Sequence, residues 1–104
     1  MKTINAYKLQ KCQDFVCPLE FMIDAKRLKP LGVTYFAPVE LITTRHHPEV
    51  LFLKSLGSVI ILDVDNKDNI ILLDEIFSPS IVDTRYRLAV NRDYMVIVSA
   101  PNII

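Results

Sequence analysis

Hydrophobic and polar residues alternate most regularly near the end of the chain. Along residues 84–90 every second side chain is apolar or aromatic, which is the period of a half-buried strand. The two faces of this segment carry Tyr86, Leu88 and Val90 on one side and Arg85 and Arg87 on the other. An Asn-Arg-Asp turn at 91–93 leads into a second apolar run at 94–99, so the pattern predicts a β-hairpin.

A second hairpin is predicted immediately before the first. Residues 58–64 and 70–77 are rich in Ile, Leu and Val, and the polar segment 65–69 between them is typical of a turn. Both faces of these two runs are apolar, which indicates a sheet that is covered on both sides. The acidic turn lacks the glycine that a calcium-binding loop requires, so we interpret it as a solvated turn.

The clearest helical pattern in the chain spans residues 18–29. Pro18 suits the first helical position, and Glu20 lies in the first turn, where negative charge is favoured. Basic residues occupy the last turn, where positive charge is favoured. Pro30 and Gly32 would end the helix.

Three further segments are predicted less distinctly. Residues 3–9 alternate weakly and are consistent with a first strand. Residues 33–43 are rich in strand formers, but Pro38 lies among them and cannot donate to a ladder, which favours an edge strand, a bulge or two short strands. Residues 48–56 fit a short helix and a strand equally well.

These elements define an α+β fold. We expect a mainly antiparallel sheet, with two C-terminal hairpins and one or two short helices packed on it. A chain of 104 residues has the length of one domain, so we expect a single compact domain over residues 1–104.

The composition is unusually apolar for so small a chain. Hydrophobic residues make up 51% of the sequence and charged residues only 23%. A small domain has little interior in which to bury them, so part of this apolar surface should remain exposed as a patch, and such patches usually mark contacts. The composition therefore favours a protein partner or self-association.

The charge balance and the absence of targeting signals further narrow the class of protein that the sequence predicts. Twelve basic and twelve acidic residues balance, whereas nucleic-acid-binding domains are usually basic. The N-terminal residues lack the apolar stretch of a secretory signal, and the longest apolar runs are the length of strands, not of membrane spans. We therefore expect a cytoplasmic protein, of the producing cell or of a host cell, with two reduced cysteines and no membrane partner.

Cysteine and histidine residues provide the weak case for a metal site. Cys12 and Cys17 are spaced at the loose end of the range for zinc ligands, and His46 and His47 are the only histidines. Adjacent histidines rarely point at one ion, and free cysteine commonly behaves as a small apolar residue. We expect no metal or cofactor, and these four residues are the ones that a metal would use.

The expected contact residues are apolar side chains with a rim of arginines. The apolar candidates are Phe52, Phe77, Ile103 and Ile104, and the rim candidates are Arg85, Arg87 and Arg92. No nucleophile elbow, phosphate loop or zinc-protease motif is present in the sequence. We therefore predict a non-enzymatic protein-binding or assembly module, of the kind that viruses and mobile elements encode as accessory or structural proteins.

Two alternatives remain open. The first is a small metal- or histidine-dependent enzyme built on the two histidines and the two cysteines. The second is a nucleic-acid-binding β domain that uses the three arginines, although the neutral net charge makes it less favoured than a protein partner.

Overall fold

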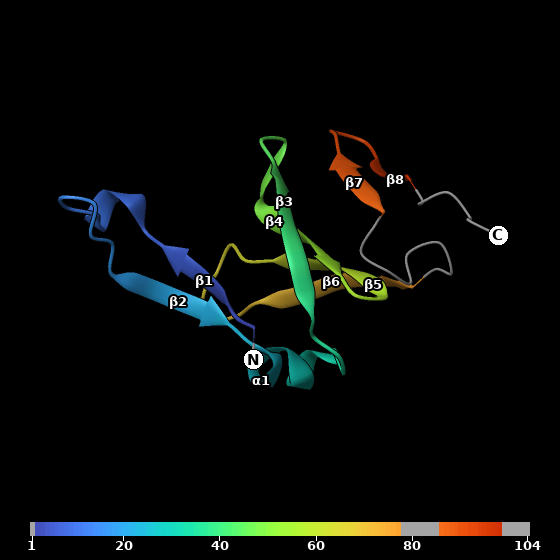
Figure 1. The fold of residues 1–104 in the computed structure, drawn as a ribbon, viewed down its shortest axis with the longest axis horizontal. Helices are drawn as coiled ribbons and strands as arrows, with labels where there is room; N and C mark the ends of the chain where they lie inside the picture. The colour runs from blue at the N-terminus through green and yellow to red at the C-terminus, as the bar shows by residue number, and fades with distance from the viewer. Residues whose placement is uncertain (1, 78–85, 99–104) are drawn as a thin grey trace. The chain divides into compact units, whose positions relative to one another are not determined.

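The computed structural model describes residues 2–77 and 86–98 of the chain (Figure 1). Within these residues, strands dominate, all strand pairs are antiparallel, and α1 is the only α-helix. The α+β class is therefore confirmed in outline, with much less helix than expected. The chain divides into two compact units, residues 1–36 and 37–104, and each is described by itself. The expectation of one domain stays a prediction.

The first unit is built on a β-hairpin. Strand β1 (Ile4–Tyr7) pairs with β2 (Leu19–Ile23), and a 3-10 turn, η1 (Leu9–Lys11), follows β1. The first predicted strand is thereby confirmed, in shortened form. The register of the pair shifts between Ala6 and Tyr7, so the ladder contains a bulge or irregularity at this point.

The predicted helix over residues 18–29 is largely wrong. Residues 19–23 form β2, and the helix α1 is confined to Ala25–Leu28, followed by a 3-10 turn, η2 (Lys29–Leu31). The helix begins where Asp24 accepts a hydrogen bond from the backbone N–H of Arg27 at 2.9 Å, which is the geometry of an N-cap. The chain reversal before β2 brings it alongside β1, and this pairing overrides the local helical preference.

The second unit contains a four-stranded antiparallel sheet. Its strands are β3 (Pro38–Thr44), β4 (His47–Ser55), β5 (Ser58–Asp63) and β6 (Ile71–Phe77), in the spatial order β3-β4-β5-β6. The predicted hairpin of residues 58–77 corresponds to β5 and β6, and it forms half of this larger sheet.

The sheet also resolves the two ambiguous segments. Residues 48–55 lie in strand β4, which pairs with a neighbour on each side, and Leu56 lies in the turn that follows. Pro38 is the first residue of β3, which is an edge strand, and this is one of the few positions where a sheet tolerates proline. The edge-strand interpretation of residues 33–43 is therefore confirmed for the part of the segment that pairs.

The last two strands form a separate hairpin. Strand β7 (Arg87–Val90) pairs with β8 (Met95–Val98) without a register shift. Tyr86 is buried, while the neighbouring Arg87 is exposed, so the predicted alternation is confirmed for this part of the hairpin. Residues 78–85 and 99–104 lie outside the described part of the chain.

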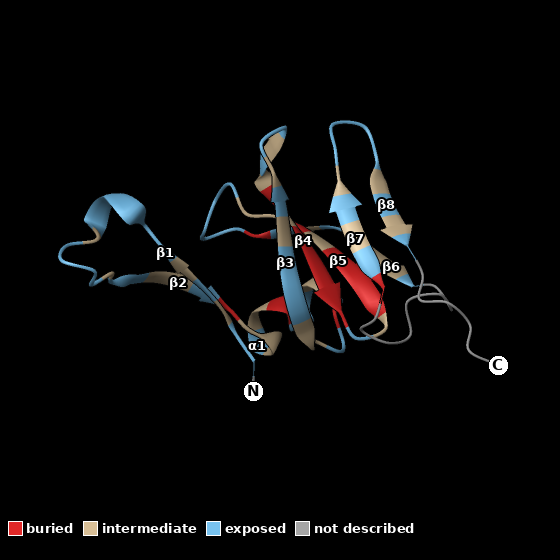
Figure 2. Ribbon diagram, turned by 45° about the horizontal axis from the view of Figure 1, so that its top comes forward, coloured by how far each residue is buried: buried red, intermediate tan, exposed pale blue. Residues whose placement is uncertain are grey.

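The hairpin β7–β8 packs on one face of the four-stranded sheet. Val59 of β5 and Tyr86 are fully buried against one another and form the centre of a hydrophobic cluster. The partly buried members of this cluster are Ile61, Ile76, Leu88, Met95 and Ile97. Figure 2 shows that the buried residues of this unit gather in β4 and β5, the two central strands. The second unit is thus two layers, a sheet and a hairpin.

Candidate functional site

Tyr86 attaches the hairpin β7–β8 to the sheet. Its hydroxyl donates to the backbone oxygens of Ser55 and Ser58, each at 3.2 Å, and these residues end β4 and begin β5. Burial raises the pKa of the Tyr86 hydroxyl, the hydrogen bond to Ser55 lowers it, and the charge of Glu40 raises it further. The hydroxyl therefore keeps its proton and remains a donor at neutral pH.

A buried lysine lies against the same aromatic ring. The Nζ atom of Lys54 is 4.7 Å from the centroid of the Tyr86 ring and 3.9 Å from Oε2 of Glu40. Lys54 is only 5% exposed, so its charge is almost removed from water. The ring face and the carboxylate both favour a cation at this position, which compensates for the lost hydration.

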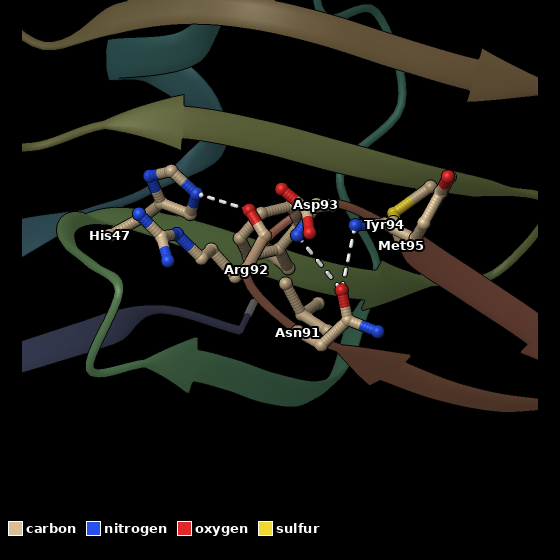
Figure 3. Close-up of a pocket in the computed structure, with 8 residues that line it drawn as sticks. His47, Asn91, Arg92, Asp93, Tyr94 and Met95 are labelled. Atoms are coloured by element: carbon tan, nitrogen blue, oxygen red, sulfur yellow. Dashed lines mark hydrogen bonds between the residues drawn. The ribbon is translucent and has the colours of Figure 1, made fainter.

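A small hollow lies between the beginning of β4 and the tip of the hairpin β7–β8 (Figure 3). It is lined by His47, Phe52, Val90, Asn91, Arg92, Asp93, Tyr94 and Met95. Three residues that the sequence analysis selected for different reasons, His47, Phe52 and Arg92, therefore meet here. The volume of the hollow is about 180 Å³, whereas sites for small organic ligands usually measure roughly 300–1,000 Å³. This small volume favours a structural role for the lining residues over the binding of such a ligand.

His47 anchors the tip of the hairpin instead of facing a free ligand site. Its Nε2 atom donates to the backbone oxygen of Arg92 at 3.0 Å, so this nitrogen carries a hydrogen and cannot ligate a metal (Figure 3). The side-chain oxygen of Asn91 accepts from the N–H groups of Asp93 and Tyr94, which closes the turn. His46 is exposed in the turn between β3 and β4.

The two cysteines are joined to one another. Cys12 and Cys17 form a disulfide with their Cα atoms 4.2 Å apart, so the expectation of two reduced thiols is wrong. Bonded sulfurs do not ligate metals, and no group of three or more metal-ligating side chains occurs in residues 2–77 and 86–98. Disulfides persist mainly in oxidising compartments, so the cytoplasmic location stays a prediction that the redox state of this pair in cells would test.

The predicted contact residues fall into three groups. Phe77, Arg87 and Arg92 are exposed, and Phe77 ends the edge strand β6 with 70% of its surface accessible. Phe52 is only 8% exposed and lines the hollow, so it is not available as a direct contact. The residues Arg85, Ile103 and Ile104 lie outside the described part of the chain.

The outer face of the hairpin β7–β8 carries Arg87, which was among the predicted contact residues, and three apolar residues that were not. We define this outer face as Arg87, Ala89, Val96 and Val98, all of them exposed. The register pairs Arg87 with Val98 and Ala89 with Val96, so the four side chains share one side of the hairpin. Strand β8 is apolar at all four positions, so the sequence did not indicate which of its residues would lie on the outer face.

Apolar side chains are abundant on the surface of the described residues. Sixteen large hydrophobic residues are exposed there, against eleven that are buried. Exposed single apolar residues are normal, whereas large contiguous apolar patches usually mark contacts. This excess agrees with the expectation that the sequence has more apolar residues than so small a fold can bury.

Comparison of the chain with protein-family models, curated proteins and solved structures finds no match. Of the helices in the described part of the chain, none has the length and apolar character needed to cross a membrane.

Glu75 is a charged residue that the sheet partly removes from water. It pairs with the fully buried Ile60 across β5 and β6, and burial raises the pKa of its carboxyl group. A raised native pKa means that the stabilising contribution is present below the unfolded pKa and is lost as the pH rises through the native pKa. At neutral pH the charged carboxylate of Glu75 therefore lowers the stability of the folded state, because folding partly removes this charge from water.

We expect Glu75→Gln to raise the urea midpoint of unfolding at pH 7, because the neutral amide is not penalised by burial. The difference between variant and parent should shrink towards zero as the pH falls below 4.5, the ordinary pKa of the carboxyl group. Urea titrations at a series of pH values measure this difference. An advantage of the same size at every pH would show that ionisation of Glu75 is not its cause.

Proposed function

We propose that this protein is a non-enzymatic assembly module, in which two copies pair through the edge strand β8. The observation that supports this proposal is the chemistry of the strand edges. An edge strand presents unpaired N–H and C=O groups, and proteins that must stay apart protect such edges with charges, prolines or bulges. Strand β8, Met-Val-Ile-Val, has none of these devices.

The other edges of the second unit carry such protection. Strand β3 begins with Pro38, contains Glu40 and shows two register shifts. Strand β6 contains Asp74 and Glu75 and a register shift in its pairing with β5. Strand β7 carries Arg87 at its first position. The contrast between these strands and β8 favours β8 as an edge intended for pairing.

The main-chain pattern of the hairpin indicates which groups of β8 face outward. The N–H of Asn91 donates to the backbone oxygen of Tyr94 at 2.9 Å, and the ladder continues from this pair without a shift. Hydrogen-bonded and non-hydrogen-bonded pairs alternate in antiparallel sheets, so Met95 and Ile97 direct their backbone groups away from β7. These groups form a site for one added strand.

A second copy of β8 fits this edge. The strand is uncharged, so two copies meet without repulsion, and a two-fold axis would place Val96 and Val98 of both copies on one continuous outer face. The pairing would extend two two-stranded sheets into a four-stranded one, and isolated two-stranded sheets are of marginal stability. Contacts between neighbouring valine side chains of the two copies on this face would add to the hydrogen bonds.

Sedimentation velocity over a range of protein concentrations tests this pairing. We expect the parent protein to form a dimer and the variant Val96→Lys with Val98→Lys to dissociate at least about tenfold more readily, because like charges in an interface cost several kcal/mol. Both positions are exposed, at 47% and 61%, so the folded monomer tolerates lysine.

The matched control lies on another edge strand. The variant Ile71→Lys with Leu73→Lys adds the same charge at positions that are 47% and 50% exposed on β6, and it should leave the dimer unchanged. A parent protein that stays monomeric at every concentration would contradict the proposal. An equal loss of dimer in both variants would also contradict it, because net charge would then explain the effect.

A further inference from the structure

The tip of the hairpin β1–β2, residues 12–17, is closed by a tight turn and by a covalent bond. Gln13 and Val16 exchange two backbone hydrogen bonds of 2.9 Å, one in each direction, around the two residues between them. The disulfide from Cys12 to Cys17 joins the residues just outside this pair. The tip lies at the end of the hairpin away from α1 (Figure 1).

The closed turn holds an aromatic residue in an unfavourable conformation. Asp14 and Phe15 both have positive φ, at 51° and 65°, which is the region that two-residue hairpin turns of this kind demand. Asp tolerates this region, but a bulky side chain there is an outlier, and Asp-Gly is the dipeptide that such turns favour. The backbone at Phe15 is therefore strained, and such strain persists only while the surrounding bonds enforce it.

Side-chain packing does not enforce the closed turn. Phe15 has a relative accessibility of 106%, and the neighbouring Val16 is 69% exposed. Both residues of the hydrogen-bonded pair, Gln13 and Val16, are exposed, so water competes for these bonds and their net contribution is small. The disulfide is therefore the main constraint that keeps the tip closed.

The same disulfide contributes little to the rest of the hairpin. The ladder between β1 and β2 ends at the pair of Tyr7 and Leu19, so both cysteines lie beyond it. The cysteines are separated by only 5 positions in the sequence, and a disulfide that closes so short a loop constrains the unfolded chain least. Opening this bond therefore releases the tip and leaves the ladder in place.

The disulfide is also accessible to other thiols. Both cysteines are half-buried, and the residues on either side of them, Lys11, Gln13, Val16 and Pro18, are exposed. Exchange requires that a thiolate reach one of the two sulfur atoms. Structural disulfides resist reduction by glutathione, whereas strained or exposed disulfides are the ones that exchange. The tip combines both properties, since its backbone is strained and its surroundings are open to solvent.

We propose that the disulfide between Cys12 and Cys17 is a reversible redox switch, which exchanges with thiols of the glutathione class and whose opening is favoured by the strain at Phe15. A glutathione thiolate attacks one cysteine sulfur, the bond between the two cysteine sulfurs breaks, and the other sulfur leaves as a thiolate that takes up a proton. A second glutathione thiolate then displaces the first cysteine from the mixed disulfide. The two cysteines gain two electrons and two protons, and two glutathione molecules become one glutathione disulfide.

The two states of the switch differ in what the tip presents. In the oxidised state, Phe15 and Val16 point outward from one fixed turn. In the reduced state, Phe15 returns to negative φ and the turn between Gln13 and Val16 opens. The switch lies in the first unit and is independent of the pairing proposed for β8.

Equilibration of the folded protein with mixtures of reduced and oxidised glutathione tests the proposal. Alkylation of free thiols followed by intact-mass spectrometry measures the reduced fraction. We expect the disulfide to open at the glutathione ratios of a cytoplasm, with no change in the far-ultraviolet circular dichroism. A disulfide that opens only in denaturant, or a loss of secondary structure when it opens, would overturn the proposal and assign the bond a structural role.

Two variants of Phe15 test the contribution of backbone strain. Phe15→Gly should lower the equilibrium constant for reduction by glutathione about fivefold, because glycine accepts positive φ and the closed tip is no longer strained. The matched control Phe15→Ala removes the same ring but keeps the β-carbon, so its constant should stay close to that of the parent. Equal constants for the two variants would contradict the part of the proposal that assigns the opening to strain.

Limited proteolysis with chymotrypsin tests the release of the tip. Reduction should speed cleavage after Phe15 about tenfold or more, since a closed turn must open before a protease can bind it. Tyr94, which is 70% exposed in the turn between β7 and β8, is the internal control and should be cleaved at an unchanged rate. Equal acceleration at both residues would show that reduction loosens the whole chain, and no acceleration at Phe15 would show that the disulfide does not hold the tip; either result would overturn the proposal.

Discussion

Replacing Tyr86 with alanine is expected to lower the free energy of unfolding by about 3–5 kcal/mol, the usual cost of truncating a fully buried aromatic residue. The ring of Tyr86 is the centre of the hydrophobic cluster between the sheet and the hairpin β7–β8, and its hydroxyl bridges β4 and β5. The variant loses both contributions. Small domains have a total stability of roughly 5–15 kcal/mol, so much of it depends on this residue.

The variant Tyr86→Phe separates the two contributions. It keeps the ring and removes the hydroxyl, which leaves the backbone oxygens of Ser55 and Ser58 without this donor, and we expect a loss of about 1 kcal/mol. Urea unfolding of the parent and both variants measures the difference. If Tyr86→Ala lowered the free energy of unfolding no more than Tyr86→Phe, packing of the ring would not be the interaction that holds the hairpin on the sheet.

The second large effect is expected at Lys54. Changing this residue to glutamate would bury a negative charge beside Glu40 and on the negative face of the Tyr86 ring. An uncompensated buried charge typically costs about 3–5 kcal/mol, so Lys54→Glu should leave the protein barely folded at room temperature. The main cause of this loss is the reversed sign of one charge.

Methionine is the matched control, because it keeps an unbranched apolar stem and carries no charge. The side chain of Glu40 is 54% exposed and stays hydrated when its partner is removed, so Lys54→Met leaves no buried charge unpaired and should change the midpoint of thermal unfolding only slightly. Thermal unfolding of both variants by circular dichroism provides the comparison. A methionine variant as unstable as the glutamate variant would show that the cation itself, not the absence of an anion, is required.

The strands that the sequence predicted correctly are those whose partners are close in the chain. The hairpin near 58–77 follows from two apolar runs around a polar turn, and the hairpin near 84–99 from the two-residue period of its first strand and a polar turn, all of which are local features. The helix predicted at 18–29 failed for a related reason. The start of the helix was predicted at Pro18, whereas the N-cap in the structure is Asp24. Asp24 acts as the N-cap only when the residues before it are paired with β1.

Less of the candidate site than of the fold could be predicted from the sequence. The pairing of Cys12 with Cys17 depends on a chain reversal at Asp14 and Phe15, and phenylalanine is not a usual residue for such a turn. The hydrogen bond between His47 and Arg92 joins residues 45 positions apart, and no periodicity connects them. Sequence analysis could therefore select His47 and Arg92 separately but could not place them together.

The order of strands in the four-stranded sheet repeats their order along the chain. Each strand therefore finds its partner in the segment made just before it, and the entropy lost in closing each connection is small. The hydrogen bonds of Tyr86 instead reach back 28 and 31 residues, so they can form only on a sheet that already exists. The four strands of the sheet are therefore synthesised before β7 and β8, and the arrival of these two strands gives the sheet its second layer.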